Sequence, residues 1–361
     1  MRSSSSIAQC ALLCSTVLAG LASAAEIKVK AGGKIQDAIN KANPGDQITV
    51  AKGTYPENLL VTKNNIKLVG QNGAVIVPSS PAVPNGCSGL VGAGTEAGIC
   101  VLGDVELTND VVNDEHRKVT RTKTPVKNVL IKGFEIDSFS GLNIAVVGGE
   151  NVEVRENTLV DGVRYGALTI GSTGTIITRN TVRAPTDLYF IGICMDDKST
   201  VSVTNNVISD YQIGLCMQTN GADVGHNKVS NTCVGGFIDP FVRDVSFTHN
   251  KISGLVDAAR VVRCNNLLGI NAGLVINAAI NANVQHNDVT GVTDFGNPNG
   301  FGFAAAIMLL DDLSPQHNQV QGAKVDFNDL ANNQFNVLMY TAGVNEVKHN
   351  TCTSPSDNCN F

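Results

Sequence analysis

Asparagine recurs along the middle of this 361-residue chain in one setting, in which a polar residue precedes the Asn and a hydrophobic residue follows two positions after it. The recurrences lie at Asn157, Asn180, Asn206, Asn227 and Asn250, so the steps are 23, 26, 21 and 23 residues. A fixed period of this length is typical of a repeat architecture. Each repeat carries two or three short β-branched runs without helical periodicity. We therefore expect a β solenoid that turns sharply at each Asn, because Asn tolerates a left-handed backbone and its amide can bond to the amides of neighbouring coils.

The composition suits stacked strands better than a helical globule. Hydrophobic residues make up 43% of the chain, charged residues only 16%, and there are 36 glycines. This hydrophobic share is ample for one elongated domain with a continuous core. The formal net charge is −6 and no basic run occurs, so we expect no nucleic-acid partner.

The first 24 residues have the layout of a cleavable secretory signal. A single early arginine precedes an apolar stretch, which ends at Ala22-Ser23-Ala24. No later run approaches ~18 apolar residues, which is about the length that a membrane span needs. We therefore expect residues 25–361 to form a secreted, extracellular and monomeric β domain without a membrane partner. Its loop region at 78–125 should be irregular, and 351–361 should form a C-terminal tail.

Eight cysteines follow the signal, and an even count in an exported chain predicts disulfides. Cys87–Cys100 and Cys352–Cys359 predict local bridges. Cys194 and Cys216 lie 22 residues apart in matching contexts, so they should stack on adjacent coils at roughly the 4.8 Å strand spacing, within reach of a bridge. No CxxC pair occurs, which argues against a metal site. The full set is Cys87, Cys100, Cys194, Cys216, Cys233, Cys264, Cys352 and Cys359.

The segment after the signal predicts a short helix at the start of the stack. Ile35, Ala38 and Ile39 lie on one helical face, and Asn43-Pro44-Gly45 ends the helix. Such a helix would cap the open end of the solenoid, which otherwise presents unpaired backbone groups. Short strands separated by turn residues follow at Gln47–Val50, Leu59–Val61 and Ile66–Val69.

This opening, together with Gly53-Thr54-Tyr55, resembles the start of the right-handed parallel β-helix proteins of the pectin-lyase-like group. The repeats from Val126 to about Asn350 share the resemblance, which therefore covers most of the chain after the signal. The group includes pectate lyases, alginate lyases and epimerases, and polygalacturonases. The resemblance implies an all-β, right-handed, single-stranded parallel β-helix, and it is much less specific for activity.

In the proteins of this group, one strand of every coil contributes to a sheet whose outer face bears the catalytic groups. Here those strands should begin near Gly166, Gly192, Gly214 and Gly236. Counting from these glycines places Asp239 in a column otherwise filled by Met and Thr. Both alternate columns are largely apolar, so the period of two does not tell which one faces outward.

Loop lengths predict a groove on this sheet. The coils between Leu142 and Pro240, which carry no long insertions, should form its floor, with long loops rising at both ends. The charged stretch Asn109–Lys123 is expected to be a solvated excursion, and His116 within it has no assigned role.

Two aspartate motifs resemble catalytic motifs of the group. Asp196-Asp197-Lys198 is similar to the paired aspartates of polygalacturonases, which flank a glycosidic bond as acid and base. The neighbouring Asn-Thr-Asp and Gly-His-Gly motifs of that family are missing. Asp239-Pro240-Phe241 is similar to the Asp-Pro-His-Glu site of alginate epimerases, with Phe241 in place of the histidine and Val242 in place of the acid.

A lyase or epimerase needs a base, a proton donor and a group that neutralises the substrate carboxylate. The expected base is Tyr165, Tyr211 or Lys198, and the neutralising groups are arginines, whose forked guanidinium suits carboxylates. The catalytic candidates are Asp196, Lys198, Asp239, Arg263 and Tyr165. The substrate-binding candidates are Asp197, Gln218, Arg243 and Arg260. Arg260 and Arg263 serve equally well as structural partners of aspartates.

Five histidines precede an Asn of the repeat and are expected to form one row: His226, His249, His286, His317 and His349. Stacked imidazoles are ligands for a divalent metal, with His226 and His249 as weak candidates. A generic polar surface position is the alternative. Calcium would need a cluster of outward acids, which the sequence does not show, so no cofactor is expected.

The leading prediction is a secreted carbohydrate-active protein, a lyase or epimerase acting on an acidic, uronate-containing polysaccharide or oligosaccharide. The first alternative is a non-catalytic cell-wall, host-contact or carbohydrate-binding protein, which the apolar columns favour. Further alternatives are a glycoside hydrolase of the polygalacturonase type and an isomerase or cyclase of a small metabolite.

Overall fold

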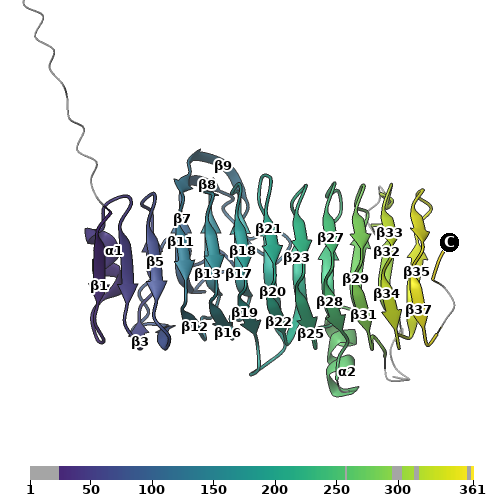
Figure 1. Ribbon diagram of the computed structural model, residues 1–361. Coiled ribbons are helices and arrows are strands. Elements are labelled where there is room, and N and C mark those ends of the chain that lie inside the picture. The colour runs from purple at the N-terminus through teal and green to yellow at the C-terminus, as the bar shows by residue number, and fades with distance from the viewer. Residues whose placement is uncertain (1–23, 257, 295–302, 313–316, 356–358) are drawn as a thin grey trace, which may run out of the picture.

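The chain winds into a right-handed parallel β-helix, as Figure 1 shows for the computed structural model. The structure describes residues 24–256, 258–294, 303–312, 317–355 and 359–361. Three parallel sheets run along the axis, and each coil adds one short strand to each of them. The predicted fold class is therefore confirmed. The expected secretory signal falls almost entirely on residues 1–23, which lie outside the described residues.

The first sheet holds twelve strands in chain order. They are β1 (Glu26–Val29), β2 (Gln47–Val50), β5 (Lys67–Gly70), β11 (Leu130–Lys132), β15 (Glu153–Arg155), β18 (Ile176–Thr178), β21 (Ser202–Thr204), β24 (Asp223–Gly225), β27 (Ser246–Thr248), β30 (Asn283–Gln285), β33 (Lys324–Asp326) and β36 (Glu346–Lys348).

The second sheet holds eleven strands. They are β3 (Gly53–Pro56), β6 (Ala74–Val77), β12 (Glu135–Asp137), β16 (Thr158–Val160), β19 (Thr181–Arg183), β22 (Val207–Ser209), β25 (Lys228–Ser230), β28 (Lys251–Ser253), β31 (Asp288–Thr290), β34 (Asp329–Ala331) and β37 (Thr351–Thr353).

The third sheet has ten longer strands and carries the candidate site. They are β4 (Leu59–Val61), β7 (Ala97–Leu102), β13 (Leu142–Val147), β17 (Tyr165–Ile170), β20 (Tyr189–Asp196), β23 (Tyr211–Met217), β26 (Val234–Ile238), β29 (Asn271–Asn277), β32 (Ala304–Leu310) and β35 (Phe335–Tyr340). Two small sheets flank it, the antiparallel hairpin β8 (Asp104–Leu107) with β9 (Val119–Thr124), and the pair β10 (Val126–Lys127) with β14 (Gly149–Glu150).

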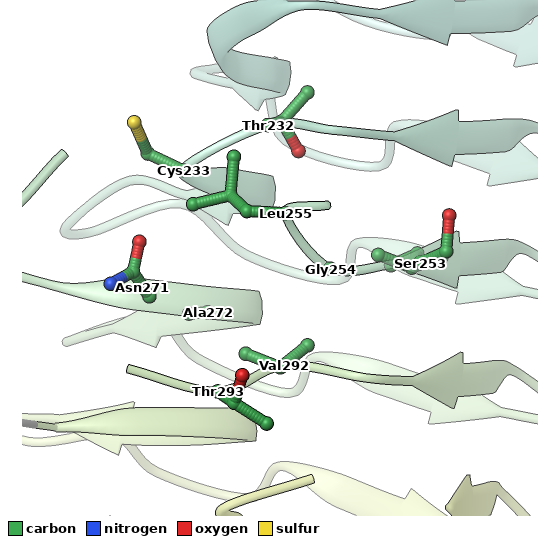
Figure 2. A pocket seen from close by; sticks show the side chains of 10 residues that line it. Thr232, Cys233, Ser253, Gly254, Leu255, Asn271, Ala272, Val292 and Thr293 are labelled. Carbon is green, nitrogen blue, oxygen red and sulfur yellow. The ribbon is translucent and has the colours of Figure 1, made fainter. Parts of the chain in front are cut away.

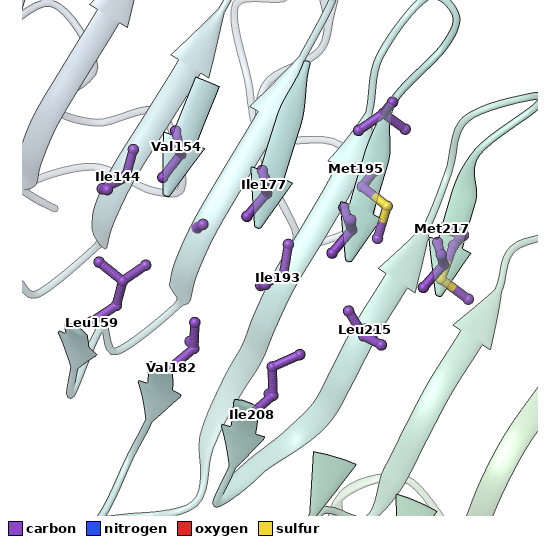
Figure 3. Packing of buried hydrophobic residues seen from close by; sticks show 14 of the residues in the cluster. Ile144, Val154, Leu159, Ile177, Val182, Ile193, Met195, Ile208, Leu215 and Met217 are labelled. Carbon is purple, nitrogen blue, oxygen red and sulfur yellow. The ribbon is translucent and has the colours of Figure 1, made fainter. Parts of the chain in front are cut away.

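The inward side chains of the three sheets fill one continuous apolar core. Figure 3 shows Ile193 and Leu215 of the third sheet pointing toward Val182 and Ile208 of the second. These side chains are fully or almost fully buried. Each such buried side chain contributes roughly 1.5–3 kcal/mol to the stability of the fold. The β-branched residues among them also suit the pleated strands. The core is therefore what holds the three sheets together.

The Asn residues of the repeat form a buried ladder. The Nδ2 of Asn157 donates to the Oδ1 of Asn180 at 3.1 Å, and the same bond recurs from Asn180 to Asn206 and from Asn206 to Asn227, at 3.0 Å each. The ladder continues to Asn250 and beyond, so the predicted bonding between coils is confirmed. The left-handed residue is the one before each Asn, such as Glu156 with φ 54°, and not the Asn itself. The predicted conformation of the Asn was therefore wrong.

A column of glycines runs through neighbouring strands of the third sheet, at Gly166, Gly192, Gly214 and Gly235. At Gly192, an added Cβ would lie 2.7 Å from the carbonyl oxygen of Gly214, which leaves no room for a side chain. The column passes through Gly235 and not Gly236, because Gly236 pairs with Leu215. The sequence offered two adjacent glycines, and counting from the second shifted every later residue of that coil by one place.

Helix α1 (Ile35–Lys41) lies beside β1 at the N-terminal end of the stack (Figure 1). Its buried residues are Ile35, Ala38 and Ile39, as its sequence pattern predicts. The side chain of Glu57 accepts hydrogen bonds from the backbone N–H groups of Ile35 and Gln36, which have no partner within the helix. Glu57 thereby fixes the start of α1 on the first coil.

Three disulfides staple the described chain, Cys87–Cys100, Cys233–Cys264 and Cys352–Cys359. The two predicted local bridges are confirmed, and such bridges are typical of oxidising compartments. Cys194 and Cys216 are in register on β20 and β23, as predicted, but both are free thiols. The predicted bridge between them is therefore wrong in this structure.

Two insertions cover parts of the third sheet. The segment 103–125 includes the stretch Asn109–Lys123, which was expected to be a solvated excursion. It forms the β8–β9 hairpin and folds over the outer face, where Leu107 and Val119 pack on the sheet. Helix α2 (Ala258–Leu267) protrudes from the opposite edge (Figure 1). The floor of the predicted groove is therefore covered, and Cys194 and Cys216 are almost fully buried. None of the helices among the described residues combines the length and apolar character that crossing a membrane requires.

Candidate functional site

Three polar residues lie at the carboxyl ends of neighbouring strands of the third sheet. Met195, Met217 and Ile238 pair in register and point into the core. The next residues, Asp196, Gln218 and Asp239, therefore form one outward column at the carboxyl ends of β20, β23 and β26. Asp239 does not belong to the methionine column in which the sequence count placed it.

The tip of the segment 103–125 brings three more polar side chains to this column. Its base is closed by a bond from the Thr108 N–H to the Lys118 carbonyl, at 2.9 Å. Arg164, from the coil below, donates to the carbonyl of Asp114. Between these anchors, Glu115, His116 and Lys118 reach the outer face of the sheet. We call Glu115, His116, Lys118, Tyr165, Asp196, Gln218 and Asp239 the polar cluster.

Asp196 is bound by two groups of the tip. Lys118 Nζ lies 3.0 Å from its Oδ2, and His116 Nε2 lies 3.1 Å from the same oxygen. On its other side, His116 Nδ1 lies 3.3 Å from the Tyr165 hydroxyl. With its proton on Nε2, His116 donates to Asp196 and accepts from Tyr165. Asp196 is thus a carboxylate with a cation beside it and about a fifth of its side chain exposed.

Asp239 lies in a different environment. Gln218 Nε2 donates to Asp239 Oδ2 at 2.7 Å and to Glu115 Oε2 at 2.6 Å, so two acids share one nitrogen. Burial and, next, the Glu115 carboxylate raise the pKa of Asp239 to about 7. At neutral pH, Asp239 therefore holds its proton for about half of the time.

The two aspartates differ in the way that acid–base catalysis requires. Asp196 faces a cation, whereas Asp239 faces another acid. Two carboxyl groups in such different surroundings are suited to the separate roles of base and acid. Strands in a sheet are about 4.8 Å apart, so the backbones of Asp196 and Asp239, two strands apart, are separated by roughly 10 Å. Gln218 lies between them, and Lys118 Nζ contacts both Asp196 and the Gln218 Oε1, the latter at 2.8 Å.

Tyr165, the predicted base, joins the cluster but is fully buried. Burial raises the pKa of its phenol well above the usual range. A base must lose its proton readily, so this shift is opposite to what the predicted role needs. Tyr211, the second tyrosine considered, is also fully buried, and its side chain lies in the core.

Asp197 faces inward, away from the polar cluster. Its Oδ1 accepts hydrogen bonds from the Thr169 hydroxyl at 2.7 Å and the Ser172 N–H at 3.2 Å. Burial raises its pKa to about 6. This side chain holds the turn after β20, and the predicted contact with substrate does not fit its position.

Lys198 and Arg243 lie exposed in the turns that follow β20 and β26. They are near the polar cluster along the chain, and no ion pair is recorded for either one among the described residues. We call this exposed pair, which follows Asp196 by two residues and Asp239 by four, the basic rim.

Arg260 and Arg263 are on helix α2, at the opposite ends of the strands. Arg263 pairs with Asp187, and Arg260 Nη1 lies 3.0 Å from Asp210 Oδ1. Asp187 is nine residues before Asp196, and an extended strand of this length spans more than about 20 Å. The structure therefore does not bring these arginines to Asp196 and Asp239, and the structural alternative fits them better.

The predicted histidine row exists, with one exchange. His226, His249 and His286 stack with ring centroids 4.9 and 5.0 Å apart, and Phe327 and His349 continue the stack. Phe327 occupies the place expected for His317, which lies outside the row. Stacked parallel rings direct their nitrogens alongside one another and do not converge on one ion. Among the described residues, no group of three or more His, Cys, Asp or Glu side chains is arranged to hold a metal.

A small cavity lies beside the Cys233–Cys264 bridge, and no residue of the polar cluster lines it. Figure 2 shows Thr232, Cys233, Leu255 and Asn271 around it. Its volume is about 10 Å³, which is room for one water molecule at most. It is a packing defect beside the Cys233–Cys264 bridge and too small for a substrate.

Sequence reasoning did not identify Glu115, His116 and Lys118, because nothing in the sequence indicates where a long loop packs. The column of Asp196 and Asp239 did leave a signal. An inner column must be apolar throughout, so Met195, Met217 and Ile238 form a better inner column than one that ends in an aspartate.

No family model and no curated protein matches the sequence. Solved structures share the fold. An exopolygalacturonase of Yersinia enterocolitica matches with TM-score 0.60 and 13% identity, over 94% of this chain and 77% of that one. The DFA-IIIase of Arthrobacter chlorophenolicus, without its lid, matches with TM-score 0.60 and 13% identity, over 89% and 94%. An alginate lyase of Paenibacillus matches with TM-score 0.52 and 13% identity, over 92% and 97%. The chain therefore has the fold of the pectin-lyase-like β-helix proteins.

Proposed function

We propose that this is an exported, carbohydrate-active protein and that its polar cluster cleaves a glycosidic bond. In the proposed reaction, Asp239 gives its proton to the glycosidic oxygen as the C–O bond breaks. Asp196 takes a proton from the water that attacks the anomeric carbon, so one water is consumed for each bond. The observation that carries the proposal is the outward column in which one carboxyl is paired with a cation and the other is held by a second acid.

The charge of the cluster favours this chemistry over the expected uronate lyase. Glu115, Asp196 and Asp239 supply three carboxyl groups, and Lys118 is the one lysine, already bound to Asp196 and Gln218. Such a site stabilises the positive charge of an oxocarbenium-like transition state. It repels the carboxylate of a uronate. The backbones of the two aspartates are roughly 10 Å apart, with Gln218 between them, which leaves more room than the carboxyl separation of about 5 Å in retaining enzymes. We therefore expect inversion at the anomeric carbon.

The solved structures with this fold support the substrate class. They include an exopolygalacturonase, a DFA-IIIase and an alginate lyase. The cluster is confined by the tip of 103–125, which suits a short oligosaccharide or a chain end better than the middle of a long polymer.

The second candidate is the lyase or epimerase acting on a uronate. The basic rim of Lys198 and Arg243 favours it, because either cation is able to bind a substrate carboxylate at the edge of the cluster.

One set of incubations separates the candidates. Neutral, amino and uronate oligosaccharides are incubated with the protein, and the products are followed by reducing-end release, anomeric NMR and the absorbance of an unsaturated uronate. New reducing ends of inverted configuration support the proposal. Asp239→Asn and Asp196→Asn should each lower kcat by 10²–10⁴-fold, whereas Asp223→Asn, on the exposed face of the first sheet, should leave it unchanged. An unsaturated product identifies the lyase, and binding without any product contradicts both candidates.

A further inference from the structure

We infer that Glu115 is a positioning residue whose carboxylate, held against Asp239 by the shared Gln218 amide, keeps a proton on Asp239 at neutral pH. The inference deepens the proposed function, since it explains how Asp239 is kept ready to donate. Glu115 itself need not touch a substrate.

The geometry places the two acids together. One nitrogen, Gln218 Nε2, lies 2.6 Å from Glu115 Oε2 and 2.7 Å from Asp239 Oδ2. The two hydrogens of this amide nitrogen hold the two carboxyl groups close together, and two ionised carboxylates at this distance repel each other. Together with burial, this repulsion raises the pKa of Asp239.

The surroundings decide which acid keeps the proton. Asp239 directly follows β26 in a half-buried position, with the Cys216 thiol 3.9 Å from its Oδ1. The other charged groups facing it are Lys118 of the same tip and Asp196 at the end of β20. Lys118 is already bound to Asp196, so it compensates little of the charge near Asp239. Cys216 is a buried thiol, and Asn277, at the end of β29, carries no charge.

The contact of Glu115 with Gln218 and Asp239 depends on a loop and not on the coils of the β-helix. Glu115 lies in the segment 103–125, whose tip is tied down by the Arg164 contact to Asp114 and by the Lys118 pair. The proton affinity of Asp239 is therefore set by a residue far from it in the chain. Asp239 therefore has its raised proton affinity only while the segment 103–125 is packed on the sheet.

The test is a titration that needs no substrate. The protein is labelled with ¹³C at the aspartate carboxyl carbons, and the Asp239 signal is assigned by its loss in Asp239→Asn. In the wild type it should titrate near neutral pH. Glu115→Gln keeps the hydrogen-bond acceptor and removes the charge, so the proton affinity of Asp239 should fall about tenfold or more.

Controls separate charge from packing. Glu115→Asp keeps the charge and should retain most of the raised affinity. Glu106→Gln, on β8 and paired with Lys123, should leave the titration unchanged. Unshifted His116 ring signals show that the tip stays seated, and Glu115→Ser removes the same charge if the Gln variant does not fold. An unchanged titration in Glu115→Gln, or an equal fall in Glu115→Asp, overturns the inference.

The outcome is independent of whether the protein hydrolyses a glycan. If a substrate is identified, the high-pH limb of kcat/KM should move to lower pH in Glu115→Gln by the same factor. A normal titration result without any glycan turnover would refute the proposed function and leave the inference standing.

Discussion

Replacing Asp239 by Asn should stabilise the protein, and increasingly so as the pH rises. Asn has the same shape, and its carbonyl oxygen can accept the bond from Gln218 Nε2 that Asp239 accepts at 2.7 Å. It carries no charge to bury beside Glu115. An aspartate in the unfolded chain has a pKa near 3.8, whereas that of Asp239 in the fold is about 7.

The size of the effect follows from this difference. Below pH about 4 the carboxyl is protonated in both states, so wild type and variant should be equally stable. Between about pH 4 and pH 7 the unfolded chain has released the proton that the folded protein still holds, so the wild type loses stability across this range. Above about pH 7 both states are ionised, and the difference from the variant stays constant. Each pKa unit corresponds to 1.36 kcal/mol, so the full difference above pH 7 is about 4 kcal/mol. Solvent reaches part of the side chain, which makes this figure an upper limit.

The assay is equilibrium unfolding in urea at pH 4, 6 and 8, followed by far-ultraviolet circular dichroism because the chain has no tryptophan. Asp223→Asn, at an exposed position of the first sheet, is the matched control and should show no such trend. A stability difference between Asp239→Asn and wild type that stays constant with pH would refute the reasoning. So would a wild type that gains on the variant as the pH rises.

Other predictions address the scaffold and the expected site. Asn227→Ala should destabilise the fold by about 4 kcal/mol, because it removes a side chain that makes four buried hydrogen bonds, and urea unfolding measures this. Alkylation followed by mass spectrometry should find two free thiols, Cys194 and Cys216, that react only after unfolding, whereas labelling of the native protein would contradict their burial. Arg263→Ala should change the free energy of unfolding by less than about 1 kcal/mol, because its partner Asp187 is a surface residue. It should also leave kcat unaltered, and a large fall in kcat would indicate that Arg263 acts in the site after all.

The fold was predictable because its signal is repeated. From Asn157 to Asn350, successive coils place an Asn at the same corner, so errors in one coil do not disturb the inference from the others. The local bridges Cys87–Cys100 and Cys352–Cys359 were predictable for a related reason, since short sequence separations leave few alternatives.

The site was less predictable, for two physical reasons. Gly235 and Gly236 cannot be told apart in the sequence. Only the pairing of Gly236 with Leu215 shows that Gly235 is the residue in register with Gly214. A shift of one residue moves a side chain to the opposite face, which displaced Asp239. The second reason is that Glu115 and His116 reach the sheet through long-range packing of an aperiodic loop, and no local pattern encodes such a contact.

The asparagine ladder also has a direction. Each Nδ2 donates toward the C-terminal neighbour, from Asn157 to Asn180 and so on to Asn350. The amide dipoles are therefore aligned head to tail, and each bond polarises the next. A break in the middle of such a row separates two aligned segments, whereas a break at its end only shortens the row. The interior coils should consequently resist opening more than their similar local sequences suggest, and fraying should begin at the two ends of the molecule.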